Sequence, residues 1–205
     1  MRTRLVCALS FVLSSLAACE TGERSEEPVE DLTPTVVLET SKGRIILELD
    51  KEKAPITVEN FLWHVQGGFY NGLVFHRVMP GFVIQTGLVT PQFTNRQSTA
   101  SFIENEAANG LHNLRGTVAM ARTRDINGAR SQFFINLANN TNLDFKDSTV
   151  EGFGYAVFGR VIEGMDVVDS IAAGATRVRG QHRNFPVEPV VIRHAYVRTE
   201  TAEGT

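Results

Sequence analysis

Short β-rich segments separated by glycine or Asn-Gly turns make up most of the chain from Thr35 onward, and this pattern constrains the fold most strongly. The run TVVLETSKGRIILELD places two such segments around Ser41-Lys42-Gly43, where glycine can adopt the positive φ of a tight hairpin turn. The further segments are GLVFHRV, GFVIQTG, GTVAMAR, SQFFINL, YAVFGRV and PVVIRHAYVR. Because parallel strands would need crossover helices between them, the pattern predicts an antiparallel sheet.

Two helices are expected beside these strands. APITVENFLWHVQGG carries Pro55 where a helix would begin and Gly67 where it would end, with apolar residues at helical spacing between them. EGMDVVDSIAAG places Val168, Ile171 and Ala172 on one face. Many short strands with two helices favour a mainly all-β fold, either a barrel or a sandwich, and a closed barrel has the advantage of leaving no sheet edge.

The first 18 residues differ in kind from the rest and predict a signal peptide. A cationic MRTR precedes an apolar run of roughly a dozen residues, which is shorter than the ~20 that a membrane-spanning helix needs. The run ends in LAAC, which resembles the lipobox of bacterial lipoproteins, so Cys19 is expected to be lipidated and to become the first residue of the mature protein. Ordinary cleavage after Ala17 is the alternative.

Residues 19–34 read as an acidic tether, because they are nearly free of large apolar side chains and contain two prolines. The folded domain is expected at residues 35–198, followed by a disordered tail at 199–205. A net charge of -3 makes nucleic acid an unlikely partner. The chain is therefore expected to be exported and lipid-anchored to a bacterial membrane, facing the periplasm or the cell exterior, and to be a monomer.

The common enzymatic motifs are missing from the expected domain. It has no HExxH, GxSxG or GxxxxGK[ST] sequence and no cysteine, so neither a metal nor a cofactor is expected. His76 could act as a general base, although a strand histidine is more often a structural hydrogen-bonding group. Glu104 and Glu106 are most simply solvated, and a glycosidase-like pair has no further support.

One reaction needs none of these groups. Rotation about an X–Pro bond breaks no covalent bond, yet it faces a barrier of about 18–20 kcal/mol because the nitrogen lone pair is delocalised into the carbonyl. A catalyst needs an apolar pocket for the ring and a fixed donor that draws the lone pair back onto nitrogen. In FHRVMPGFVIQTG, the permanently charged Arg77 suits the donor role, Phe82 and Val83 suit the pocket wall, and Gln85 suits a hydrogen-bonding arm. The Pro80-Gly81 turn would fold the two arms together.

FHRVMPGFVIQTG, GTVAMART, SQFFINLA and YAVFGRVIEGMDVVD resemble, in order and spacing, the motifs of the cyclophilin family of peptidyl-prolyl cis-trans isomerases. The resemblance runs from about Thr35 to Arg198 and is greatest to the bacterial exported members. It implies an eight-stranded antiparallel closed barrel with two capping α-helices. It also implies binding of proline-containing segments of unfolded or folding proteins, and assistance to their folding.

The resemblance also assigns roles to individual residues. Arg77 becomes the catalytic donor, the main chain at Arg122 pairs with the peptide, and Phe134 forms the floor of the proline pocket. The remaining substrate-binding residues that it implies are Phe82, Val83, Gln85, Met120, Ala121, Gln132, Leu143 and Tyr155.

The sequence departs from the family pattern in two places. Asn142 precedes Leu143 where strongly drug-binding members carry tryptophan, so weak or no cyclosporin binding is expected. Tyr155 replaces a histidine of many eukaryotic members and keeps an aromatic wall. A non-catalytic proline-peptide binding or chaperone module on the same fold stays open until the rate is measured. A lipocalin-like barrel that carries an apolar ligand inside is the third interpretation, but the bulky segments FVI, QFFI and AVF predict a packed interior instead.

Overall fold

The computed structural model describes residues 31–199 of the protein. The predicted signal peptide, Cys19 and most of the predicted tether lie outside the described residues, and so do residues 200–205 of the predicted tail. The predicted boundaries at residues 18 and 34 therefore remain predictions.

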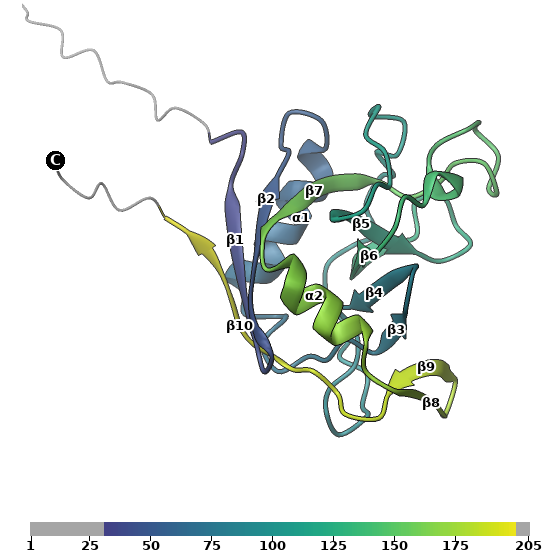
Figure 1. Ribbon diagram of the computed structural model, residues 1–205. Coiled ribbons are helices and arrows are strands. Elements are labelled where there is room, and N and C mark those ends of the chain that lie inside the picture. Colours follow the sequence, from purple (N-terminus) through teal and green to yellow (C-terminus); the bar gives the residue numbers. More distant parts are fainter. Residues whose placement is uncertain (1–30, 200–205) are drawn as a thin grey trace, which may run out of the picture. The chain divides into compact units, whose positions relative to one another are not determined.

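Eight strands form one antiparallel sheet in the order β10-β1-β2-β7-β5-β6-β4-β3, as Figure 1 shows. A separate hairpin pairs β8 with β9, and a short 3-10 helix, η1, follows β6. The elements are β1 Thr35–Thr40, β2 Gly43–Leu49, β3 Arg77–Met79, β4 Val83–Thr86, β5 Thr117–Arg122, β6 Ala129–Asn136, η1 Thr141–Leu143, β7 Val157–Glu163, β8 Thr176–Arg179, β9 His182–Pro186 and β10 Ile192–Arg198. The predicted mainly-β, antiparallel architecture is confirmed.

The predicted closure of the barrel is overstated, because the sheet curls into a half-barrel. Its edge strands β10 and β3 share no ladder, and the gap between them is spanned by an isolated bridge between Val74 and Val191. The main-chain N–H of Ile192 also donates to the carbonyl of Leu73 (2.8 Å). The segment GLVFHRV was expected to be a full strand, but only its end belongs to β3, so this edge is too short to close the sheet.

Two helices cover the sheet, as the sequence predicts. Helix α1 (Pro55–Gln66) begins at the predicted proline and packs against β10 and β6. Helix α2 (Met165–Ala172) packs against β2, β3 and β4 and buries Val168, Ile171 and Ala172. No helix within residues 31–199 is both long enough and apolar enough to cross a membrane.

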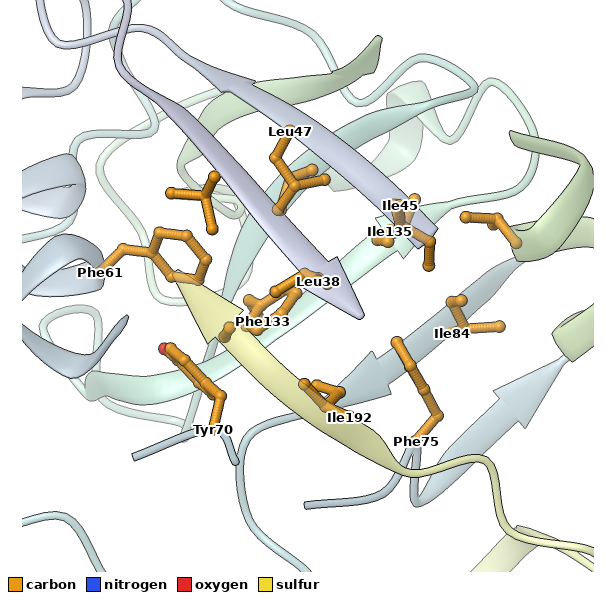
Figure 2. Close-up of a cluster of buried hydrophobic side chains, with 14 of the residues drawn as sticks. Leu38, Ile45, Leu47, Phe61, Tyr70, Phe75, Ile84, Phe133, Ile135 and Ile192 are labelled. Carbon is orange, nitrogen blue, oxygen red and sulfur yellow. The ribbon is translucent and has the colours of Figure 1, made fainter. Parts of the chain in front are cut away.

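The concave side of the sheet is filled by apolar side chains, which Figure 2 shows in close-up. Phe61 of α1 packs against three other aromatic rings of this core, with centroids 5.1 to 5.3 Å from those of Tyr70, Phe133 and Phe158. Each fully buried side chain of this size contributes roughly 1.5–3 kcal/mol to stability. A packed interior is the opposite of what a ligand-carrying lipocalin-like barrel requires.

The β8–β9 hairpin was not predicted. Its sequence TRVRGQHRNFP is basic and polar and lacks an apolar alternation, so the period-2 signal of a strand is absent. β9 packs beside β3, and Phe185 is buried with Val74 and Val89 in a small separate cluster. The hairpin therefore lies against the strand that carries Arg77.

Candidate active site

The β3–β4 hairpin brings Arg77 directly opposite Gln85. The register pairs Arg77 with Gln85 and Val78 with Ile84, and the turn between the strands is closed by a hydrogen bond from Phe82 N–H to the Met79 carbonyl (3.0 Å). Gly81 has a φ of +73°, which a residue with a side chain adopts only with strain. The predicted role of Pro80-Gly81 in folding the two arms together is confirmed.

This pair continues as a row across the sheet. Gln85 of β4 lies opposite Phe134 of β6, and Phe134 lies opposite Ala119 of β5. Because directly opposed residues share a face, these side chains all lie on the convex face of the sheet. Their neighbours in the same strands, such as Ile84 and Ile135, belong to the core on the other face.

A pocket of about 340 Å³ is hollowed into this convex face. It collects every predicted catalytic or substrate-binding residue except Met120 and Gln132. The residues that line it are Arg77, Phe82, Val83, Gln85, Ala121, Arg122, Phe134, Leu143 and Tyr155.

The floor and walls of the pocket are apolar and aromatic. Phe134 is only 4% exposed and meets the ring of Tyr155 edge to face, with centroids 5.6 Å apart. Leu143 ends η1, and its carbonyl accepts a hydrogen bond from Tyr155 N–H (3.0 Å), so these two walls are joined. A slot of this kind can take a proline ring out of water.

Arg77 is half-buried and lines the pocket, and residues 31–199 accept a hydrogen bond from only one of its guanidinium nitrogens. Its Nη1 donates to Oε1 of Gln85 (3.2 Å), and Nε2 of Gln85 donates to Oε1 of Gln132 (2.9 Å). The guanidinium carbon lies 5.8 Å from the centre of the Phe82 ring. Among residues 31–199, no carboxylate forms a salt bridge with Arg77. The side chain is therefore a fixed, unneutralised cation that faces an apolar slot.

Two predicted residues lie elsewhere. The side chain of Met120 is buried in the core, because strand alternation that turns Ala119 and Ala121 outward turns Met120 inward; its predicted place in the groove is wrong. Gln132 reaches the site through Gln85 and lines an adjoining hollow of about 350 Å³. This hollow was not predicted from the sequence, because strands β4, β5 and β6 and the connecting residues 88–102 each contribute part of its lining.

The alternative acid–base candidates lie outside the pocket. His76 is 2% exposed, and burial together with the neighbouring His182 lowers its pKa to about 4. It does not line the pocket, which argues against a general base there, but its buried Nδ1 has no hydrogen-bond partner within residues 31–199, so the predicted structural hydrogen bond is not shown. Glu106 accepts hydrogen bonds from the first N–H groups of α1, at Ile56 (3.1 Å) and Thr57 (2.8 Å), and therefore caps the helix instead of being solvated.

Comparison with known proteins places this site in a family. The model of the family described as "Cyclophilin type peptidyl-prolyl cis-trans isomerase/CLD" matches residues 35–197. Peptidyl-prolyl cis-trans isomerase cyp18 of Streptomyces antibioticus is 52% identical over 163 residues, which are 80% of this chain and 98% of that protein. Peptidyl-prolyl cis-trans isomerase A of Dickeya dadantii is 48% identical over 162 residues, 79% of this chain and 83% of that protein.

A solved structure shows the same fold. The cyclophilin type peptidyl-prolyl cis-trans isomerase of Cryptosporidium parvum, crystallised in the presence of the dipeptide Ala-Pro, superimposes with a TM-score of 0.65 at 23% identity. The match covers 80% of this chain and 99% of that one.

Proposed function

The chain belongs to the cyclophilin type peptidyl-prolyl cis-trans isomerases, and from this premise we propose that it is a lipid-anchored isomerase that accelerates X–Pro rotation in exported proteins and so assists their folding. Isomerase activity follows from curated relatives that are about 50% identical over the whole domain. The signal-like residues 1–18 support the proposed export of the protein, and the LAAC motif supports its lipid anchor.

The observation that carries the mechanism is the unneutralised Arg77 at the rim of an apolar pocket. In the ground state the prolyl nitrogen shares its lone pair with the carbonyl, and this sharing creates the rotational barrier. As the bond twists, the lone pair localises on nitrogen and becomes a hydrogen-bond acceptor. A guanidinium N–H aimed at that nitrogen is therefore a better partner for the twisted state than for either planar isomer.

The pocket supplies the second part of the mechanism. Phe134 and the walls at Leu143 and Tyr155 would hold the proline ring while the carbonyl side of the bond rotates. Gln85, held by Gln132, keeps the Arg77 fork in place and has the chemistry to bind a peptide carbonyl. The dipeptide present with the Cryptosporidium relative supports a proline-containing peptide as the ligand.

The decisive experiment compares the wild-type protein with Arg77→Ala in an NMR exchange measurement on a short X–Pro peptide. Faster cis/trans exchange with the wild type and near-background exchange with the variant would support Arg77 as the donor. If a folded wild-type protein binds the peptide without accelerating exchange, the non-catalytic binding module becomes the better description.

The membrane anchor has its own test. In bacteria that express the full chain, labelled palmitate should be incorporated and the protein should sediment with membranes. The Cys19→Ala variant should incorporate no label. Incorporation by the variant would remove Cys19 as the lipidation site.

A further inference from the structure

The loop formed by residues 144–154 connects two walls of the proline pocket. It begins immediately after Leu143 and ends immediately before Tyr155, and its base is closed by the hydrogen bond from Tyr155 N–H to the Leu143 carbonyl (3.0 Å). Both flanking side chains line the pocket. A displacement of this loop is therefore passed to both walls at once.

The two ends of the loop are bonded to the domain, since Asp144 accepts from Asn113 N–H (2.7 Å) and Gly154 accepts from Nδ2 of Asn105 (3.2 Å), but residues 145–153 make their contacts mainly with one another. Lys146 N–H donates to the Gly152 carbonyl (2.7 Å), Phe153 N–H donates to the Thr149 carbonyl (2.9 Å), and the rings of Phe145 and Phe153 meet edge to face at 5.3 Å. Within the described part of the chain, residues 145–153 make a single hydrogen bond to the rest of the domain. Its donor is Nη2 of Arg122, and its acceptor is the Val150 carbonyl, at 2.7 Å.

The Arg122 side chain holds the end of the loop as well as its tip. Its Nε donates to the carbonyl of Gly154 (2.9 Å), and its Nη1 donates to the carbonyl of Thr123 (3.2 Å). The guanidinium carbon lies 5.2 Å from the centre of the Tyr155 ring, a cation–π contact. The same ring forms the edge-to-face pair with Phe134 on the pocket floor.

Strand β5 aims this side chain toward the loop. The register between β5 and β6 shifts between Met120 and Arg122, and such a bulge redirects the side chains that follow it. Only arginine offers a rigid, planar set of donors that can reach several carbonyls while stacking on an aromatic ring; lysine has one nitrogen and no plane. The charge is partnered by neutral carbonyls, since no carboxylate among residues 31–199 forms a salt bridge with it.

We propose that the Arg122 side chain is a positioning residue, which holds loop 144–154 and the Tyr155 ring and thereby sets how tightly the pocket binds the proline-containing peptide. The proposal rests on the proposed function and adds a side-chain role to the predicted main-chain contact. Arg122 acts on the wall, whereas Arg77 acts on the rotating bond. Loss of the Arg122 side chain should therefore weaken peptide binding and leave the isomerisation rate of the bound peptide, kcat, nearly unchanged.

The test uses the full chain with Arg122→Met, which keeps the volume without the donors, and Arg122→Lys, which keeps the charge. Arg124→Ala is the matched control, because Arg124 is an exposed arginine on the same segment whose side chain lies outside the pocket. NMR titration gives the peptide Kd, exchange spectroscopy gives kcat, and hydrogen–deuterium exchange reports on residues 145–153.

In Arg122→Met we expect the peptide Kd to rise about 5- to 20-fold, kcat to stay within about twofold, and the loop amides to exchange at least about tenfold faster. The Kd and the loop amide exchange of Arg122→Lys should lie between those of the wild type and those of Arg122→Met. Arg124→Ala should match the wild type in both. Unchanged Kd and unchanged loop exchange in Arg122→Met would overturn the proposal. Faster hydrogen–deuterium exchange of the β6 amides as well as of the loop amides would also overturn it, because the substitution would then destabilise the whole domain.

The outcomes separate this proposal from the proposed function. If the wild type binds the peptide without accelerating its isomerisation, the proposed catalysis fails, while the Kd and the loop exchange still decide the role of Arg122. If the wild type is active and Arg122→Met behaves like it in both measurements, only the inference about Arg122 fails.

Discussion

Replacement of Arg77 by alanine is the sharpest test of how the pocket works. Within residues 31–199 the guanidinium donates one hydrogen bond, to Gln85, and its other N–H groups have no acceptor beside the apolar slot. A hydrogen bond from a charged donor is worth about 1.5–3 kcal/mol. Since each 1.36 kcal/mol is tenfold in rate, Arg77→Ala should lower kcat/KM by roughly ten- to a hundredfold.

Peptide binding should survive this change, because Phe134, Leu143 and Tyr155 remain in place. The assay is cis/trans exchange of an X–Pro peptide followed by NMR, with the peptide Kd measured in the same samples. Arg193→Ala is the control, since Arg193 is exposed on β10 and outside the pocket, and its removal changes the net charge equally. Arg77→Lys, which keeps the charge and loses the fork, should fall between the wild type and Arg77→Ala. Wild-type turnover in Arg77→Ala would refute the reasoning.

Three further predictions follow from the same geometry. Gln85→Glu would place a carboxylate against Arg77 and neutralise its charge, so kcat/KM should fall at least about tenfold in the cis/trans exchange assay. The circular dichroism spectrum should stay unchanged, and full activity would contradict this prediction. Phe134→Ala should raise the peptide Kd and lower the free energy of unfolding by about 3 kcal/mol, measured by urea denaturation; an unchanged Kd would remove Phe134 from the pocket floor. Burial and the neighbouring His182 lower the pKa of His76 from 6.5 to about 4. Between pH 6.5 and pH 4 the unfolded chain therefore binds a proton at His76 that the folded protein does not bind. The free energy of unfolding should therefore fall by up to about 3 kcal/mol as the pH drops from 6.5 to 4, and His76→Gln should flatten that slope.

The parts of the site that were predictable from the sequence depend on local rules. Pro80-Gly81 between two β-rich arms specifies a hairpin, and strand alternation then places Arg77 and Gln85 on the same face. Helix α1 was predictable for similar reasons, since a proline marks its beginning and its apolar residues recur at helical spacing. Each of these inferences used neighbours within about a dozen residues.

The parts that were not predictable depend on pairing between distant segments. Met120 is an apolar residue between two alanines, and only the register of β5 against β6 determines that it faces the core. β3 is short because residues 72–75, which were expected to extend it, contact the start of β10 instead, more than a hundred residues away. The acceptors of Arg122 are carbonyl groups, which every residue carries, so no pattern of side chains could have revealed them.

The same strands carry the core on one face and the site on the other, and this makes their register a functional property. A slip of one residue between β3 and β4 would move Ile84 from the core to the pocket and would bury Gln85. The cost of burying an unpaired amide, added to the loss of a core side chain, opposes such a slip. The turn that fixes the register therefore protects catalysis and stability together, although Pro80 and Gly81 do not line the pocket.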